Sequence, residues 1–149
     1  LRHHADWRND LTKKISCRAG GVQFLLSSRY YGPLFFTIQI KLMPNFKHIS
    51  PQDAHAMAAA GNCQLADIRD EQSFATAHIP AATHLDNQSL QQFVEAADPD
   101  KALIIYCYHG NSSQSAAQYF VEKDFTEVYS MDGGFEMWRQ LYPQDTVTG

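Results

Sequence analysis

The chain has 149 residues, of which 44% are hydrophobic and 19% charged, as in an ordinary folded domain. Its three cysteines are widely spaced, which fits neither a disulfide framework nor a zinc site built from Cys-x-x-Cys pairs, so we expect a reducing, cytoplasmic compartment. A net charge of −4 without a basic stripe in the main body argues against nucleic acid as a partner, and no run of about 18 apolar residues predicts a membrane span.

Charge divides the sequence near Met43, which is its first methionine. Residues 1–42 carry seven basic and two acidic side chains, a net charge of +5, whereas residues 43–149 carry five and fourteen, a net charge of −9. The first segment shows no sustained helical or alternating period, and glycines and a proline interrupt its apolar parts. We interpret residues 1–42 as a disordered or non-native extension, with a targeting or docking segment as the alternative, and residues 43–149 as the folded domain.

Strands and helices are predicted to alternate from Met43 onward. Ser50 is expected to cap the first helix, Pro51 to occupy its first position, and Asn87 to cap the third helix. Helices are expected at 51–60, 71–79, 88–97, 112–123 and 134–142, and strands at 64–68, 82–85, 101–106 and 127–131. The strand at 101–106 is apolar without alternation, which is typical of a strand buried on both faces. This order predicts a single α/β domain with a mainly parallel central sheet and helices on both faces.

The most informative stretch is "CYHGNSS", residues 107–113, which follows the buried strand and precedes a helix. Ligand sites in such sheets lie beyond the carboxyl ends of the strands. A loop that curls back at this edge presents backbone N–H groups to a common centre, with Gly110 and Asn111 tolerating the required backbone angles. Ser112 or Ser113 is available to cap the helix and to offer a hydroxyl inward. We therefore expect the pKa of Cys107 to be lowered by amide donors and the helix dipole.

The loop composition favours sulfur chemistry over phosphoryl transfer. A cysteine phosphatase loop of related shape is one residue longer and ends in an arginine, whose planar fork clamps a phosphoryl group. Here Ser112 and Ser113 occupy the corresponding positions. Amide donors without that fork still suit a large, polarisable, singly charged sulfur species.

Four motifs carry a resemblance to a known family. The segments "ADIRD", "AHIPAATHL", "CYHGNSS" and "DGGFEMW" make the chain from Lys47 to Tyr142 resemble the single-domain rhodaneses. The resemblance implies a rhodanese-like domain and a thiosulfate sulfurtransferase, in which Cys107 takes the outer sulfur of thiosulfate as a persulfide and sulfite is released. Cyanide or a dithiol protein such as thioredoxin then accepts the sulfur, with no metal or organic cofactor. One departure is Ala81, where the family usually has glycine.

Candidate site residues follow from the loop and from this resemblance. Cys107 is the expected nucleophile, and the expected substrate-binding residues are Tyr108, His109, Gly110, Asn111, Ser112, Ser113 and Arg69. His109 is not needed as a base, because backbone donors already favour the thiolate. Arg69 is expected to pair with Asp67 and brace neighbouring loops, or alternatively to draw in thiosulfate. The alternatives for the whole chain are a non-catalytic rhodanese-like binding module and a cysteine phosphatase or arsenate reductase.

Overall fold

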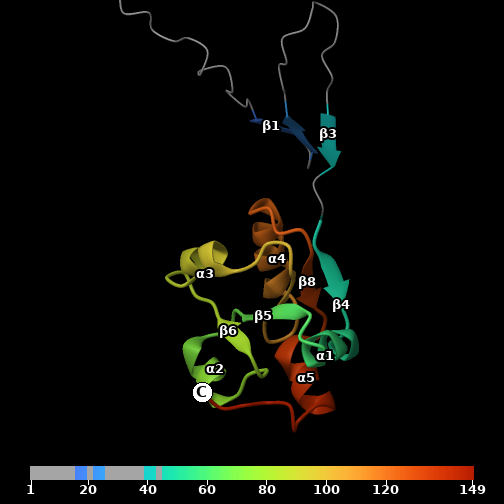
Figure 1. Ribbon diagram of the computed structural model, residues 1–149. Coiled ribbons are helices and arrows are strands. Elements are labelled where there is room, and N and C mark those ends of the chain that lie inside the picture. Colours follow the sequence, from blue (N-terminus) through green and yellow to red (C-terminus); the bar gives the residue numbers. More distant parts are fainter. Residues whose placement is uncertain (1–15, 20–21, 26–38, 43–44) are drawn as a thin grey trace, which may run out of the picture. The chain divides into compact units, whose positions relative to one another are not determined.

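The computed structural model describes residues 16–19, 22–25, 39–42 and 45–149 (Figure 1). The chain forms two units, Leu1–Met43 and Pro44–Gly149. The first contains an antiparallel sheet of β1 (Ser16–Ala19), β2 (Val22–Leu25) and β3 (Gln39–Leu42). The sequence analysis predicted no strand in this segment, and the interpretation of residues 1–42 as an extension stays a prediction. No helix among the described residues is long and apolar enough to cross a bilayer.

The second unit is built on a five-stranded sheet in which every neighbouring pair is parallel. The strands are β4 (Lys47–Ile49), β5 (Cys63–Asp67), β6 (Ala82–His84), β7 (Ala102–Tyr106) and β8 (Val128–Met131), in the spatial order β4-β8-β7-β5-β6. The helices are α1 (Pro51–Ala59), α2 (Glu71–Thr76), α3 (Leu90–Ala96), α4 (Ser112–Glu122) and α5 (Gly134–Leu141). The predicted α/β class with a parallel sheet is confirmed.

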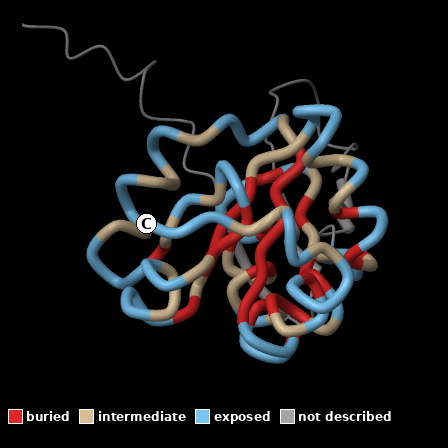
Figure 2. The backbone as a smooth tube through the Cα atoms, turned by 90° about the horizontal axis from the view of Figure 1, so that it is seen from below, coloured by how far each residue is buried: buried red, intermediate tan, exposed pale blue. Residues whose placement is uncertain are grey.

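Two hydrophobic cores lie on the two faces of this sheet. Ile104 and Tyr106 of β7 belong to one core, with residues of α1 and α5, whereas Leu103 and Ile105 belong to the other, with residues of α3 and α4. All five residues of β7 are buried, and buried backbone runs through the middle of the domain (Figure 2). Cys107 therefore follows a strand whose position is fixed from both sides by packing.

Helix starts follow the predicted capping chemistry in α1 but not in α3. The Ser50 hydroxyl accepts the Asp53 N–H at 3.1 Å, as expected for an N-cap. Helix α3 begins at Leu90 with Ser89 as N-cap, so the predicted cap at Asn87 is wrong. The physical reason is the carboxylate of Asp86. It accepts the N–H groups of Gln88 and Ser89, at 2.8 and 2.7 Å, and so folds this segment into a turn.

Ala81 adopts left-handed backbone geometry, with φ of +64°, and it is exposed. This conformation brings Cβ close to the following carbonyl in any residue except glycine and costs about 1 to 2 kcal/mol. Glycine adopts this backbone geometry without that cost, whereas the alanine of this chain bears it.

We expect Ala81→Gly to raise the free energy of unfolding by about 0.5 to 1 kcal/mol, because the relief of strain exceeds the entropy that glycine adds to the unfolded chain. Thermal or urea unfolding measures the effect. The matched control is Ala56→Gly on the exposed face of α1 and inside the helix, which should lose about 0.5 to 1 kcal/mol. Equal destabilisation by both changes would contradict this account of Ala81.

Candidate active site

Cys107 lies directly after β7, at the carboxyl edge of the parallel sheet, and only 5% of its surface is exposed. Its Sγ accepts the N–H of Gly110 at 3.2 Å and lies 3.5 Å from the hydroxyl oxygen of Ser113. Ser113 is itself held by the hydroxyl of Ser130 in β8, with 2.8 Å between the two oxygens. The sulfur therefore sits among hydrogen-bonding groups of the loop and of the start of α4, and a neighbouring strand holds one of them in place.

These donors change the acidity of the thiol. Burial is the largest influence and opposes ionisation, but the hydroxyl and backbone N–H of Ser113 and the N–H groups of Gly110 and His109 together outweigh it. The pKa of Cys107 is consequently lowered from the ordinary value of a thiol. A lowered pKa means that more of the protein carries the nucleophilic thiolate at neutral pH.

The carbonyl groups of the loop are turned away from the sulfur by α5. The Phe135 N–H donates to the Cys107 carbonyl at 2.8 Å, and the Glu136 N–H donates to the Tyr108 carbonyl at 3.0 Å. This close approach requires Gly134, where an added Cβ would lie 2.5 Å from both carbonyl oxygens. The N–H groups at the start of α5, which have no partner within the helix, thus bind the loop carbonyls.

Gly110 shapes the other side of the loop. Its φ is +88°, and an added Cβ would lie 2.8 Å from the carbonyl oxygen of Met131. Only glycine fits both the backbone angle and the space. The loop can therefore turn its Gly110 N–H toward the sulfur.

The remaining predicted loop residues face outward. Tyr108, His109, Asn111 and Ser112 are exposed, whereas Gly110 and Ser113 are buried. Asn111 is the N-cap residue of α4 but makes no side-chain capping hydrogen bond, so neither serine caps this helix. The Gly110 N–H and the Ser113 hydroxyl lie next to the sulfur, whereas the other four side chains lie at the rim of the loop.

Arg69 forms a buried ion pair with Asp67. Its Nη2 lies 2.6 Å from the Asp67 carboxylate and also donates to the Ala77 carbonyl at 2.7 Å. The guanidinium lies 3.9 Å from the centre of the Phe135 ring. These contacts match the expected bracing pair, and they reach α5 next to the amide that holds the Cys107 carbonyl. Binding of thiosulfate by Arg69 stays a prediction.

Asp70 and Ser130 also belong to the site, although neither was predicted from the sequence. The Tyr108 hydroxyl donates to the Asp70 carboxylate, and this bond, with the Ser73 donors, lowers the pKa of Asp70 to about 2. Asp70 also caps α2 by accepting the Ser73 N–H at 2.9 Å. Its capping role was visible in the sequence, but its partner Tyr108 lies 38 residues away and gave no local signal.

Among the described residues no cluster of three His, Cys, Asp or Glu side chains could hold a metal ion.

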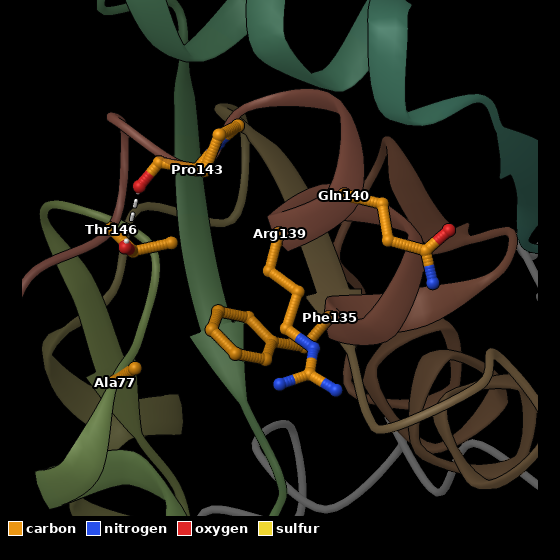
Figure 3. Close-up of a pocket in the computed structure, with 6 residues that line it drawn as sticks. All are labelled: Ala77, Phe135, Arg139, Gln140, Pro143 and Thr146. Carbon is orange, nitrogen blue, oxygen red and sulfur yellow. Dashed lines mark hydrogen bonds between the residues drawn. The ribbon is translucent and has the colours of Figure 1, made fainter.

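A hollow beside α5 lies outside the loop. It is lined by Ala77, Phe135, Arg139, Gln140, Pro143 and Thr146, and Arg139 extends next to the Phe135 ring (Figure 3). None of these residues belongs to the segment 107–113. A neighbouring depression shares Ala77, Phe135 and Arg139 with this hollow and is also lined by Tyr108 of the loop.

The parallel α/β fold with a cysteine loop at its carboxyl edge defines a rhodanese-like class of protein. The family model described as "Rhodanese-like domain" matches residues 50–141, and the chain belongs to this family. It is 54% identical over 107 residues to the thiosulfate sulfurtransferase GlpE of Pseudomonas syringae pv. syringae, covering 72% of this chain and 100% of that one. It is 58% identical over 103 residues to GlpE of Stutzerimonas stutzeri, covering 69% and 94%.

Solved structures support the fold. The rhodanese-like domain from Anabaena sp. superposes with a TM-score of 0.61 at 15% identity, covering 68% of this chain and 79% of that one. At this identity the likeness concerns the arrangement of strands and helices. The close sequence relatives carry the functional comparison.

We expect Ser113→Ala to lower the rate of Cys107 alkylation by iodoacetamide at pH 7 about ten-fold, because a hydrogen bond to a charged group contributes about 1.5 kcal/mol. The alkylation rate against pH should rise at higher pH in this variant than in the wild type. Ser112→Ala, one residue earlier and exposed, is the matched control and should leave the profile in place. Identical profiles for all three proteins would show that the hydroxyl does not stabilise the thiolate.

Proposed function

We infer that this chain is a thiosulfate sulfurtransferase that works through a persulfide on Cys107. The observation that carries the proposal is the Cys107 sulfur, held by the Gly110 N–H and the Ser113 hydroxyl in a chain that covers full-length GlpE at 54% identity. The site supplies the two things this chemistry needs, which are a thiol whose pKa is lowered and hydrogen-bond donors for a bound sulfur anion.

In the first step the Cys107 thiolate attacks the outer sulfur of thiosulfate. A new S–S bond forms between Cys107 and that sulfur, and the S–S bond of thiosulfate breaks with its electron pair leaving on sulfite. Negative charge that remains on the terminal persulfide sulfur is stabilised by loop N–H groups, as an oxyanion hole stabilises developing charge. We propose that the exposed rim side chains Tyr108, His109, Asn111 and Ser112 contact thiosulfate as it enters.

In the second step an acceptor removes the sulfur. Cyanide attacks the terminal persulfide sulfur and leaves as thiocyanate, which returns Cys107 to the thiolate. A dithiol protein such as thioredoxin would take the sulfur as its own persulfide and release it as sulfide on forming a disulfide. The electrons balance in both cases without a metal or organic cofactor.

The sulfite product leaves before the acceptor reacts, so we expect parallel lines in double-reciprocal plots.

Two other functions fit the fold less well. A cysteine phosphatase needs an arginine fork at the end of its loop to clamp the phosphoryl group during transfer, and the serines that follow Asn111 provide none. A binding module needs no ionised thiol, yet the donors around Cys107 lower its pKa. Hydrolysis of an aryl phosphate without thiocyanate formation would favour the phosphatase.

Compartment and chain organisation are part of the same proposal. A thiolate nucleophile must remain reduced to turn over, so we place the enzyme in the cytoplasm. The rhodanese-like domain within residues 43–149 contains every group that the two steps use, and residues 1–42 are proposed to be an extension without a part in the chemistry.

We expect the wild-type protein to gain the mass of one sulfur atom on incubation with thiosulfate and to form thiocyanate when cyanide is added. Cys107→Ser should lose both properties, because an alcohol at this position supplies no thiolate. Cys63→Ser is the matched control and should keep both, since Cys63 lies at the start of β5 and burial raises the pKa of its thiol. Intact-mass spectrometry and a thiocyanate assay measure the outcome, and sulfur gain by Cys107→Ser would refute the assignment.

The rate of persulfide formation should rise with pH as the Cys107 thiol ionises. Because hydrogen bonds lower the pKa of Cys107, the midpoint of this rise should lie below pH ~8.5, which is the usual pKa of a free cysteine. Single-turnover sulfite release at a series of pH values measures it. A midpoint above that pH would mean that burial, and not the donors, controls the thiol.

A further inference from the structure

A second hollow of about 400 Å³ lies at the same edge of the sheet as the cysteine loop, on the face covered by α3 and α4. Its lining includes residues that follow β5 and β6 and residues from α3 and α4. The carboxyl ends of parallel strands share one edge, so the hollow and Cys107 open toward the same side of the domain. Asp70 joins the two, because it lines the hollow and accepts a hydrogen bond from Tyr108, the residue after Cys107.

The floor of this hollow is apolar. Leu85 and Phe120 are buried members of the core beneath it, and partly buried side chains pack against them. The apolar lining consists of Ile68, Leu85, Leu90, Ala116, Tyr119 and Phe120. A hollow with this lining accommodates an aliphatic side chain, because contact there removes apolar surface from water on both partners.

The rim of the hollow is acidic. Asp70, Glu71 and Asp86 line it, and none of the three forms an ion pair with another described residue. The Tyr108 and Ser73 donors keep Asp70 ionised, and Ser89 lowers the pKa of Asp86. These charges add to the field of residues 43–149, whose net charge is −9.

Four basic side chains lie nearby but do not cancel this charge. Arg69 lines the hollow with its charge already paired with Asp67. His84 also lines it and contacts the Arg69 carbonyl through Nε2 at 2.7 Å. Lys123 lies 5.3 Å from the centre of the Tyr119 ring, just past the end of α4, whereas the cysteine loop lies at the start of that helix. Arg139 lines the depression on the other side of Tyr108, but its charge is paired with Glu136, so the rim next to Tyr108 stays negative.

We propose that this hollow docks the sulfur acceptor, and that the acceptor is a cysteine thiol in a polypeptide segment with lysine or arginine beside it and an aliphatic side chain for the apolar floor. The proposal rests on the sulfurtransferase function inferred above and adds the class of acceptor. The acidic rim attracts the basic flanks and rejects acidic ones, and the aliphatic side chain fixes the segment beside Tyr108 with its thiol toward the Cys107 persulfide. The acceptor thiolate attacks the terminal sulfur, the S–S bond to Cys107 breaks, and the acceptor leaves as a persulfide.

The test uses synthetic peptides of about ten residues with one cysteine. The first carries lysines and a leucine, the second has glutamates in place of the lysines, and the third has serine in place of the leucine. Sulfur transfer from the persulfurated full-length protein to each peptide is compared with transfer to cyanide in the same preparation. Labelled copies with serine in place of cysteine report binding by fluorescence anisotropy, independently of the chemistry.

The protein variants are Glu71→Lys at the rim and Asp100→Lys as a matched charge reversal. Asp100 precedes β7 and so lies at the opposite edge of the sheet. At low salt, Glu71→Lys should lower kcat/KM for the lysine peptide relative to cyanide by at least about five-fold and weaken its binding similarly, because loss of one contact between unit charges alone predicts that factor and the new lysine also repels the peptide. Asp100→Lys should change neither ratio, and the glutamate and serine peptides should be poorer acceptors of the wild type.

The outcomes separate the two inferences. Equal losses in both variants would show that only net charge matters and would overturn the docking site, as would a wild type that uses all three peptides alike. Failure of the wild type to form thiocyanate from thiosulfate and cyanide would overturn the sulfurtransferase function and the acceptor class with it. Normal thiocyanate formation without the peptide preferences would overturn the docking inference alone.

Discussion

Two backbone hydrogen bonds from α5 determine what the cysteine loop can do. By binding the carbonyls of Cys107 and Tyr108 at 2.8 and 3.0 Å, the first amides of α5 leave the loop with N–H groups, and not C=O groups, on the side of the sulfur. A carbonyl near a thiolate would repel its charge, whereas a donor stabilises it. Helix α5 therefore acts on the reactivity of Cys107 through its backbone N–H groups. Gly134 makes this possible because it alone lets the backbones approach so closely.

The sheet supplies the rigidity that this arrangement needs. Strand β7 is buried on both faces, and Ser130 of the neighbouring β8 positions the Ser113 hydroxyl. Burial by itself would raise the pKa of the thiol, so the lowered pKa is the result of donors held in place against that cost. Donors that could rotate away would lose this competition, because each must stay within hydrogen-bonding distance of the sulfur. The lowered pKa of the cysteine therefore depends on the packing of the core.

The sequence predicted what depends on neighbouring residues and missed what depends on distant ones. The buried strand, the loop after it and the Ser50 cap follow from local pattern, and all lie where expected. The Tyr108 to Asp70 bond joins residues 38 apart and has no local signature. Position 87 looked like a helix start because asparagine caps well, but the carboxylate of Asp86 took the nearby amides and formed a turn instead. The left-handed angle of Ala81 could be suspected only because the family usually has glycine there.

The structure also explains how an acidic domain can process an anion. Amide groups attract negative charge through dipoles that act over a few ångströms, whereas the net charge of −9 acts over about 10 Å before salt screens it. An arginine at the end of the loop would bind a dianion more strongly, but it would also weaken the acidic rim beside Tyr108 and hold sulfite after the first step. Neutral donors stabilise a monoanionic sulfur at the loop and leave the surface charge unchanged. In the proposed reaction, local dipoles recognise thiosulfate and the surrounding field recognises the proposed basic acceptor, so the two substrates of one cysteine do not compete for the same interactions.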